Sequence, residues 1–118
     1  MISTITSTVD KRFDAVDVIR NAFPMGSMTG APKIEVMKAI DKVEKIKRGL
    51  FSGSLGYFSS DGDFDFNVVI RSILYNANSG EIIFQVCIAI TFDSDPELEY
   101  EECLLKASGM LKVLQADN

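Results

Sequence analysis

The hydrophobic periodicity of the chain changes once, after Arg48-Gly49, from a helical repeat to a strand-like repeat. Before that point, apolar residues recur at helical spacing in two segments, which predicts helices at 13–22 and 32–46. Pro32 falls in the first turn of the second helix, where its missing N–H is tolerated. β-branched residues over 2–9 indicate a strand ahead of both helices.

After the change, three apolar segments separated by turn residues predict strands at 51–59, 64–75 and 81–91. Asp61-Gly62 is a strong hairpin turn between the first two. Acceptor side chains in Asp93-Ser94-Asp95, followed by Pro96, predict the start of a last helix that ends near residue 115. The expected fold is therefore α+β, a three-stranded antiparallel meander plus helices.

Histidine is absent, which excludes Ser-His-Asp catalysis, histidine-ligated zinc and a histidine pH switch. Cys87 and Cys103 do not form a CxxC pair, so a zinc ribbon or a dithiol redox motif is excluded as well. Any metal ion must be held by oxygen ligands.

The length of 118 residues predicts one domain. A net charge of −5 argues against a nucleic-acid partner. No apolar run reaches the roughly 20 residues of a membrane span, so no membrane is expected. The first eight residues lack the basic and apolar regions of a secretory signal, so we expect a cytoplasmic protein with reduced thiols.

Two carboxylates and one ammonium share a face of the predicted last helix. Glu99, Glu102 and Lys106 fall within about 60° of one another at 100° per residue. They border the apolar stripe of the helix, where unpaired charge is costly. One interpretation is an oxygen-ligand site for Mg²⁺, which takes one or two carboxylates plus substrate oxygens. The other is a solvated helix with an i, i+4 ion pair between Glu102 and Lys106.

Arg71 lies inside the predicted strand 64–75, between Ile70 and Ser72. By the two-residue period of a strand it shares a face with Val69, Ile73 and Tyr75, which is not a polar face. Such an arginine either clamps a carboxylate bidentately or forms an internal salt bridge with a glutamate, and the pattern leaves both open.

A glycine-marked polar loop, Gly26 to Lys33, leads into the second predicted helix. The hydroxyls of Ser27 and Thr29, together with the positive end of that helix, suit an anionic ligand. The loop lacks the Walker A ending and spacing. The alternative is a helix-entry turn with a capping hydroxyl.

Four segments together carry a family resemblance. They are FPMGSMTGAPK at 23–33, RGLFSG at 48–53, Ile70-Arg71, and DSDPELEYEE at 93–102 followed by Lys106. In its residues and their order along the chain, this series resembles the carboxyl-terminal part of the chorismate-utilising enzymes, and within them the aminodeoxychorismate synthase branch. The resemblance implies the family's two-sheet chorismate-binding fold, with residues 1–118 as its carboxyl-terminal portion.

The resemblance also assigns roles to the site residues. The glutamates matching Glu99 and Glu102 belong to the family's Mg²⁺ site, and the positions of Arg71 and Lys106 hold substrate carboxylates. Ser27 and Thr29 fall in the loop that lines the substrate pocket. The family reaction needs its dicarboxylate neutralised and a hydroxyl to leave, which suits a cation cluster with Mg²⁺.

The chain departs from the family pattern at three substrate-pocket positions. Phe51 stands where many members have tyrosine, so a pocket hydroxyl is missing. Cys87 and Ala89 stand where glycine is common in the segment ahead of the Asp-Ser pair, so we expect either a tighter pocket or a displaced substrate. The family's histidine, its other metal-site glutamate and the catalytic lysine of this branch match positions upstream of Met1.

The resemblance implies an enzyme that converts chorismate and ammonia to 4-amino-4-deoxychorismate, for 4-aminobenzoate and folate synthesis. Its expected partners are a glutamine amidotransferase subunit that supplies ammonia and the missing amino-terminal part of the same subunit. We expect these 118 residues to be inactive alone and to form a homo-oligomer or a partly opened core. The alternatives are an anthranilate or isochorismate synthase fragment, or a non-catalytic chorismate-binding module.

Overall fold

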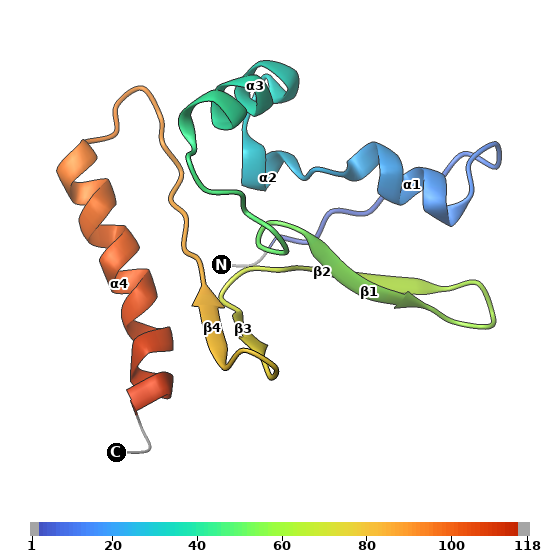
Figure 1. Cartoon of the computed structure of the whole chain (residues 1–118). Helices are drawn as coiled ribbons and strands as arrows, with labels where there is room; N and C mark the ends of the chain where they lie inside the picture. Colours follow the sequence, from blue (N-terminus) through green and yellow to red (C-terminus); the bar gives the residue numbers. More distant parts are fainter. Residues whose placement is uncertain (1–2, 116–118) are drawn as a thin grey trace. The chain divides into compact units, whose positions relative to one another are not determined.

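The computed structural model describes residues 3–115, which contain both helices and short strands (Figure 1). In chain order the elements are α1 Ala15–Ala22, α2 Gly26–Thr29, α3 Lys33–Val43, β1 Ser54–Phe58, β2 Phe64–Val68, β3 Ile73–Asn76, β4 Glu81–Phe84 and α4 Pro96–Gln115. The predicted α+β class is confirmed. The described chain divides into two compact units, one of residues 3–47 and 56–65 and the other of residues 48–55 and 66–115.

In the first unit, α1 begins with a capping box. Asp14 Oδ1 accepts a 2.8 Å hydrogen bond from the Asp17 amide, and the Asp17 carboxylate accepts one from the Asp14 amide. The predicted polar loop contains a short helix, α2, and α3 begins one residue after Pro32. The helices α2 and α3 pack closely because Gly30, at φ 134°, has no Cβ, which would lie 3.1 Å from Val36 Cγ1.

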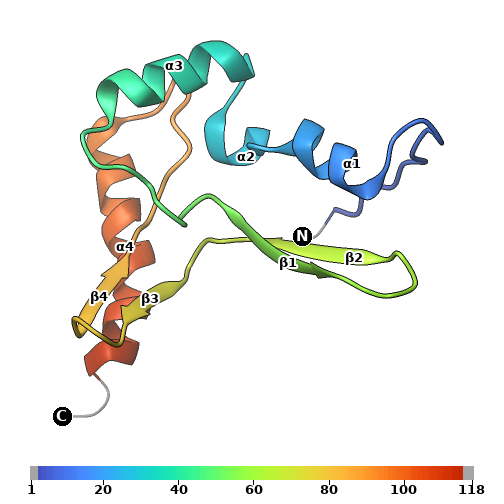
Figure 2. The same ribbon diagram turned by 45° about the vertical axis from the view of Figure 1, so that its right-hand side comes forward.

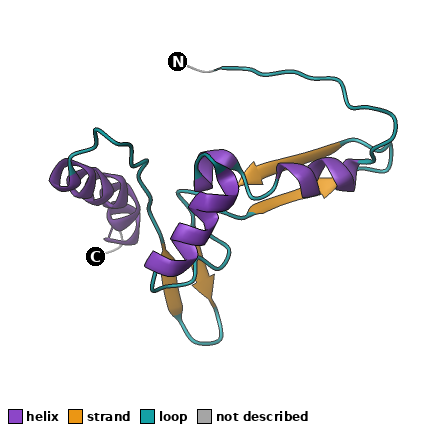
Figure 3. Ribbon diagram, turned by 90° about the horizontal axis from the view of Figure 1, so that it is seen from above, coloured by secondary structure: helices purple, strands orange, loops and turns teal. Residues whose placement is uncertain are grey.

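The predicted three-stranded meander is wrong in detail. The strands form two separate two-stranded sheets, β1 with β2 and β3 with β4, drawn as two orange pairs in Figure 3. The predicted strand 64–75 is interrupted at 69–72, because Arg71 adopts a left-handed backbone with φ 51°. The turn at Asp61-Gly62 is confirmed, with Gly62 at φ 94°.

The third predicted strand, 81–91, is also shorter in the structure. β4 pairs antiparallel with β3, with Tyr75 opposite Ile82 and Ile73 opposite Phe84, and ends at Phe84 rather than residue 91. Residues 85–90 then run extended beside α4 (Figures 1 and 2).

The predicted strand at 2–9 is absent over residues 3–9, and residue 2 lies outside the described part. A β-branched segment needs a neighbouring strand to form a sheet, and no described strand pairs with this one.

The last helix, α4, begins at Pro96 as predicted. Asp95 Oδ1 accepts a 3.0 Å hydrogen bond from the Leu98 amide and so caps the helix. Among residues 3–115, none of the helices combines the length and the hydropathy that a membrane span requires.

The described chain buries few apolar side chains. Val69 and Met110 are the buried hydrophobic residues, each 7% exposed, and both belong to the second unit. Large apolar side chains such as Leu105, at 73% exposed, lie in solvent. Most apolar surface of these elements is therefore uncovered.

Candidate functional site

Lys106 connects α4 to the extended segment 85–90 in the second unit. Its Nζ lies 2.5 Å from Glu102 Oε1, one helical turn earlier, and donates a 3.2 Å hydrogen bond to the carbonyl oxygen of Cys87. Lys106 is half-buried and Glu102 is exposed. The structure thus brings together three residues predicted from the sequence: Cys87, Glu102 and Lys106.

The environment of Lys106 stabilises its charged form. The hydrogen bond that Lys106 Nζ donates to the Glu102 carboxylate is the largest cause that raises the pKa of Lys106 above its ordinary value, and it outweighs the opposing effect of desolvation. The charge of Glu102 and the nearby thiols of Cys87 and Cys103 act in the same direction. Lys106 therefore remains a cation that can bind a carboxylate.

Glu99 is held by the loop ahead of α4. Its Oε1 accepts a 2.8 Å hydrogen bond from the Ser94 hydroxyl, and that hydroxyl accepts a 3.0 Å hydrogen bond from the Thr91 amide. Glu99 is half-buried. Ser94 lies inside the DSDP motif, which predicts the start of the helix but does not indicate this contact with Glu99, a predicted metal ligand.

The two glutamates fit Mg²⁺ in kind, because they offer hard carboxylate oxygens one turn apart on one helix. Within residues 3–115 no group of three or more histidine, cysteine or acidic side chains gathers to hold a metal ion. Glu102 also pairs with Lys106, so the ion-pair interpretation of the sequence is confirmed. The assignment of Glu99 and Glu102 to a metal site stays a prediction.

Arg71 is exposed, in the break between β2 and β3. The expected shared face with Val69, Ile73 and Tyr75 is wrong, since the left-handed backbone at Arg71 ends the two-residue period there. The internal salt bridge is also wrong for the described residues, because none of them pairs with Arg71. Carboxylate binding by its guanidinium stays a prediction.

Ser27 and Thr29 lie on α2, in the first unit. Thr29 Oγ1 donates a 3.1 Å hydrogen bond to the Met25 carbonyl, while Ser27 is exposed. The predicted alternative of a capping hydroxyl is wrong, because Met25 and Pro32 cap α2 and α3 without side-chain hydrogen bonds.

Three residues depart from the family pattern at predicted substrate-pocket positions, and all three lie in the second unit. Phe51 is half-buried in the turn ahead of β1, and its amide donates a 3.1 Å hydrogen bond to the Arg48 carbonyl. Cys87 is half-buried beside Lys106, and Ala89, two residues later, is exposed. Of the three, only the Cys87 backbone is bonded to another predicted site residue.

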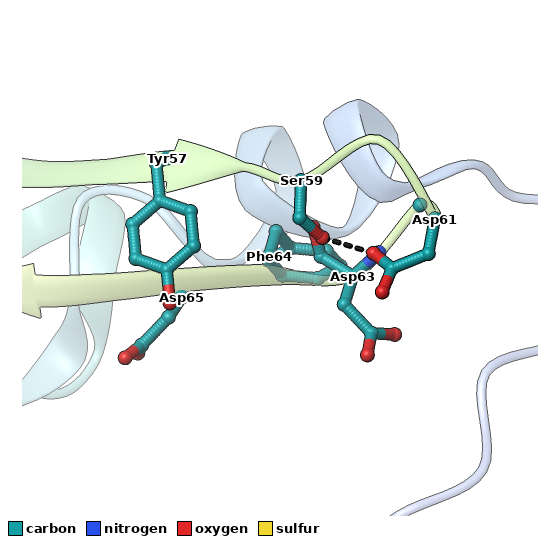
Figure 4. Close-up of a pocket in the computed structure, with 7 residues that line it drawn as sticks. Tyr57, Ser59, Asp61, Asp63, Phe64 and Asp65 are labelled. Carbon is teal, nitrogen blue, oxygen red and sulfur yellow. Dashed lines mark hydrogen bonds between the residues drawn. The ribbon is translucent and has the colours of Figure 1, made fainter.

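A hollow of about 550 Å³ lies at the tip of the β1–β2 hairpin, in the first unit (Figure 4). Hydrogen bonds from the Ser59 side chain and the Asp63 amide lower the pKa of Asp61 there. The lining residues are Tyr57, Ser59, Asp61, Gly62, Asp63, Phe64 and Asp65. None of the residues predicted from the sequence lines this hollow.

Comparisons with known proteins agree on one family. The family model described as chorismate binding enzyme matches residues 1–112. A probable chloroplastic aminodeoxychorismate synthase of Oryza sativa is 45% identical over 115 residues, which is 98% of this chain and 13% of the relative. Aminodeoxychorismate synthase component 1 of Bacillus subtilis is 38% identical, over 98% of this chain and 24% of the relative.

An anthranilate synthase component 1 of Haloarcula marismortui is similar at nearly the same level, 43% identical over 96% of this chain and 22% of the relative. The chain therefore spans a quarter or less of the length of these relatives. Because the family model covers almost every residue, the chain belongs to the family of chorismate binding enzymes and corresponds to a part of their chorismate-binding domain.

Proposed function

We propose that this chain is the carboxyl-terminal part of component 1 of an aminodeoxychorismate synthase. The observation that carries the proposal is 45% identity, across nearly the whole chain, to a probable aminodeoxychorismate synthase. The reaction replaces the 4-hydroxyl of chorismate with ammonia nitrogen: a C–N bond forms, the C–O bond breaks, and water is the second product. The amino acid chemistry of the second unit supports this assignment.

Chorismate is a dicarboxylate, so its binding requires cationic partners. Lys106 supplies an ammonium whose charge Glu102 stabilises, and Arg71 supplies an exposed guanidinium. In this proposal each cation binds one substrate carboxylate. Lys106 can do so by exchanging its Glu102 partner for the substrate, at little cost in free energy because the pair is partly exposed to water.

Glu99 and Glu102 would hold Mg²⁺, with Ser94 keeping the Glu99 carboxylate in place. When bound, the metal ion supplies positive charge against the ring carboxylate and the departing oxygen. Ser27, Thr29, Phe51, Cys87 and Ala89 would line the substrate pocket.

The proposed partners are the remainder of the same subunit and a glutamine amidotransferase that supplies ammonia. The relatives are four or more times longer than this chain, which supports a requirement for the remainder. We propose that the chain alone is inactive. The complete enzyme acts in the cytoplasm, in the pathway to 4-aminobenzoate and folate. Both cysteines are free thiols, which agrees with a reducing compartment.

The second candidate is anthranilate synthase, in which the amino group enters at position 2 of the ring. The 43% identity to the Haloarcula relative favours it nearly as strongly as the first candidate. The two candidates share the residues described above, so these residues do not separate them.

The test is an assay with chorismate, ammonium and Mg²⁺, followed by identification of the product by mass spectrometry. The chain is assayed alone and after addition of the missing amino-terminal part. Formation of 4-amino-4-deoxychorismate only in the combined sample supports the proposal. Anthranilate as product selects the second candidate, and isochorismate contradicts both. Turnover by the chain alone contradicts its proposed inactivity, and binding of chorismate without turnover in the combined sample indicates a non-catalytic module.

A further inference from the structure

Two residues other than glycine have left-handed backbones in the second unit, Ser52 at φ 66° and Arg71 at φ 51°. Such conformations are uncommon and unfavourable for residues with a side chain, and they concentrate at functional positions. Ser52 is also the buried polar residue of the described chain, 8% exposed, whereas Arg71 is exposed.

Val69 connects the two positions through its backbone. Its carbonyl accepts a 3.0 Å hydrogen bond from the Ser52 amide, and its amide donates a 2.9 Å hydrogen bond to the Gly53 carbonyl. The Val69 side chain is buried. We call these two bonds the Val69 clamp.

The turn at 50–53, which contains the two residues that bond to Val69, is tightly constrained. The Gly53 amide donates to the Leu50 carbonyl at 2.9 Å, and a Cβ on Gly53 would lie 2.7 Å from that same oxygen. Arg48 Nη1 lies 3.5 Å from Ser52 Oγ. Ser52 thus reaches its left-handed conformation inside a closed turn.

The clamp fixes one end of the break that contains Arg71, and pairing of Ile73 with Phe84 fixes the other end. Between them, the Ile70 amide donates to the Val68 carbonyl at 3.0 Å, and the Ser72 hydroxyl donates to the Ile70 carbonyl at 2.9 Å. With both ends held, the chain has three residues in which to turn, and Arg71 takes the left-handed conformation.

We infer that Ser52 is a positioning residue for Arg71: its left-handed backbone closes the Val69 clamp, which holds the break where Arg71 presents its guanidinium. The effect of this positioning on carboxylate binding rests on the proposed function. The effect on the backbone of Arg71 does not.

The test compares three variants of the 118-residue chain by NMR. Ser52→Val places a β-branched residue where only a left-handed backbone fits, Ser52→Gly restores that backbone without strain, and Met110→Ala destabilises the same unit elsewhere. The readouts are the exchange rate of the Val69 amide and the Cα and Cβ shifts of Arg71.

We expect Ser52→Val to raise the Val69 exchange rate by about tenfold or more over Met110→Ala, and to move the Arg71 shifts away from left-handed values. Ser52→Gly is expected to match the unsubstituted chain. Unchanged Arg71 shifts in Ser52→Val, or an unprotected Val69 amide in the unsubstituted chain, would overturn the inference.

A second measurement separates the inference from the proposed function. Chorismate is titrated while the Arg71 Nε–Hε resonance is followed in the chain combined with its amino-terminal part. About tenfold weaker binding in Ser52→Val, with normal binding in Ser52→Gly, supports positioning for the substrate. If chorismate never shifts this resonance, the proposed binding of a substrate carboxylate by Arg71 is wrong. The effect of Ser52 on the Arg71 backbone is still decided by the exchange rate and chemical shifts of the first experiment.

Discussion

Lys106 and Glu102 form an ion pair on α4, with 2.5 Å between Nζ and Oε1. The pair joins a residue predicted to bind substrate with one predicted to bind metal. Since a carboxylate that binds Mg²⁺ has less capacity for an ammonium partner, we expect occupation of the two predicted sites to be coupled through this pair.

Removal of the Glu102 charge is expected to lower the pKa of Lys106. Glu102 is the main cause of the raised value, so Glu102→Gln should return the pKa toward the ordinary 10.5. The measurement is an NMR titration of the Lys106 side chain. Glu101→Gln, an exposed neighbour on α4, is the control and should leave the midpoint unchanged. Equal midpoints in the chain and in Glu102→Gln would contradict the assignment.

The same pair predicts how stability depends on pH. A raised folded-state pKa means that the stabilisation is complete below about 10.5 and is lost as pH rises through the folded value. A partly exposed i, i+4 pair contributes about 0.5 kcal/mol. Urea unfolding of the chain and of Glu102→Gln should therefore differ by this amount at neutral pH and converge at strongly alkaline pH. A constant difference across that range would exclude the pair as its source.

In the complete subunit of the proposed enzyme, Glu102→Gln is expected to reduce the proposed Mg²⁺-dependent turnover by about 100-fold or more, since even outer partners of metal ligands change activity by about 10- to 100-fold. Circular dichroism should show an unchanged fold, because Glu102 is exposed. Glu97→Gln should retain activity. Full turnover by Glu102→Gln would refute its catalytic importance.

Gly53→Ala is expected to destabilise the second unit by about 1–3 kcal/mol, because the new Cβ would lie 2.7 Å from the Leu50 carbonyl oxygen. Gly109→Ala, on α4 with no atom within 4 Å of the new Cβ, should instead stabilise by up to about 1 kcal/mol. Urea denaturation of both variants measures the difference. Equal stability of the two would show that the turn at Gly53 is not closed in solution.

The isolated chain is expected to self-associate through uncovered apolar strands. Tyr75 and Ile82 face each other across β3 and β4 and are both exposed. Sedimentation velocity should show mass that rises with concentration, and replacement of both residues by lysine should reduce it. A sharp monomer at all concentrations would count against this prediction.

Local signals were sufficient for α4 and for the Asp61-Gly62 turn. Asp95 caps and Pro96 begins the helix through contacts within a few residues, so neither depends on the rest of the fold. The break at Arg71 could not be predicted in this way. It depends on hydrogen bonds between Val69 and the turn at Ser52, which are distant in sequence, and nothing in the composition of 64–75 marks it.

The amino-acid sequence alone established the chemistry available to the chain: no histidine, oxygen ligands for any metal, and the family to which it belongs. It also placed Glu99, Glu102 and Lys106 on one helical face, because helical spacing is a local property. Packing between distant segments determined the rest. The bond from Lys106 to the Cys87 carbonyl and the clamp on Val69 each join segments far apart in the chain, and such contacts depend on how the whole unit folds.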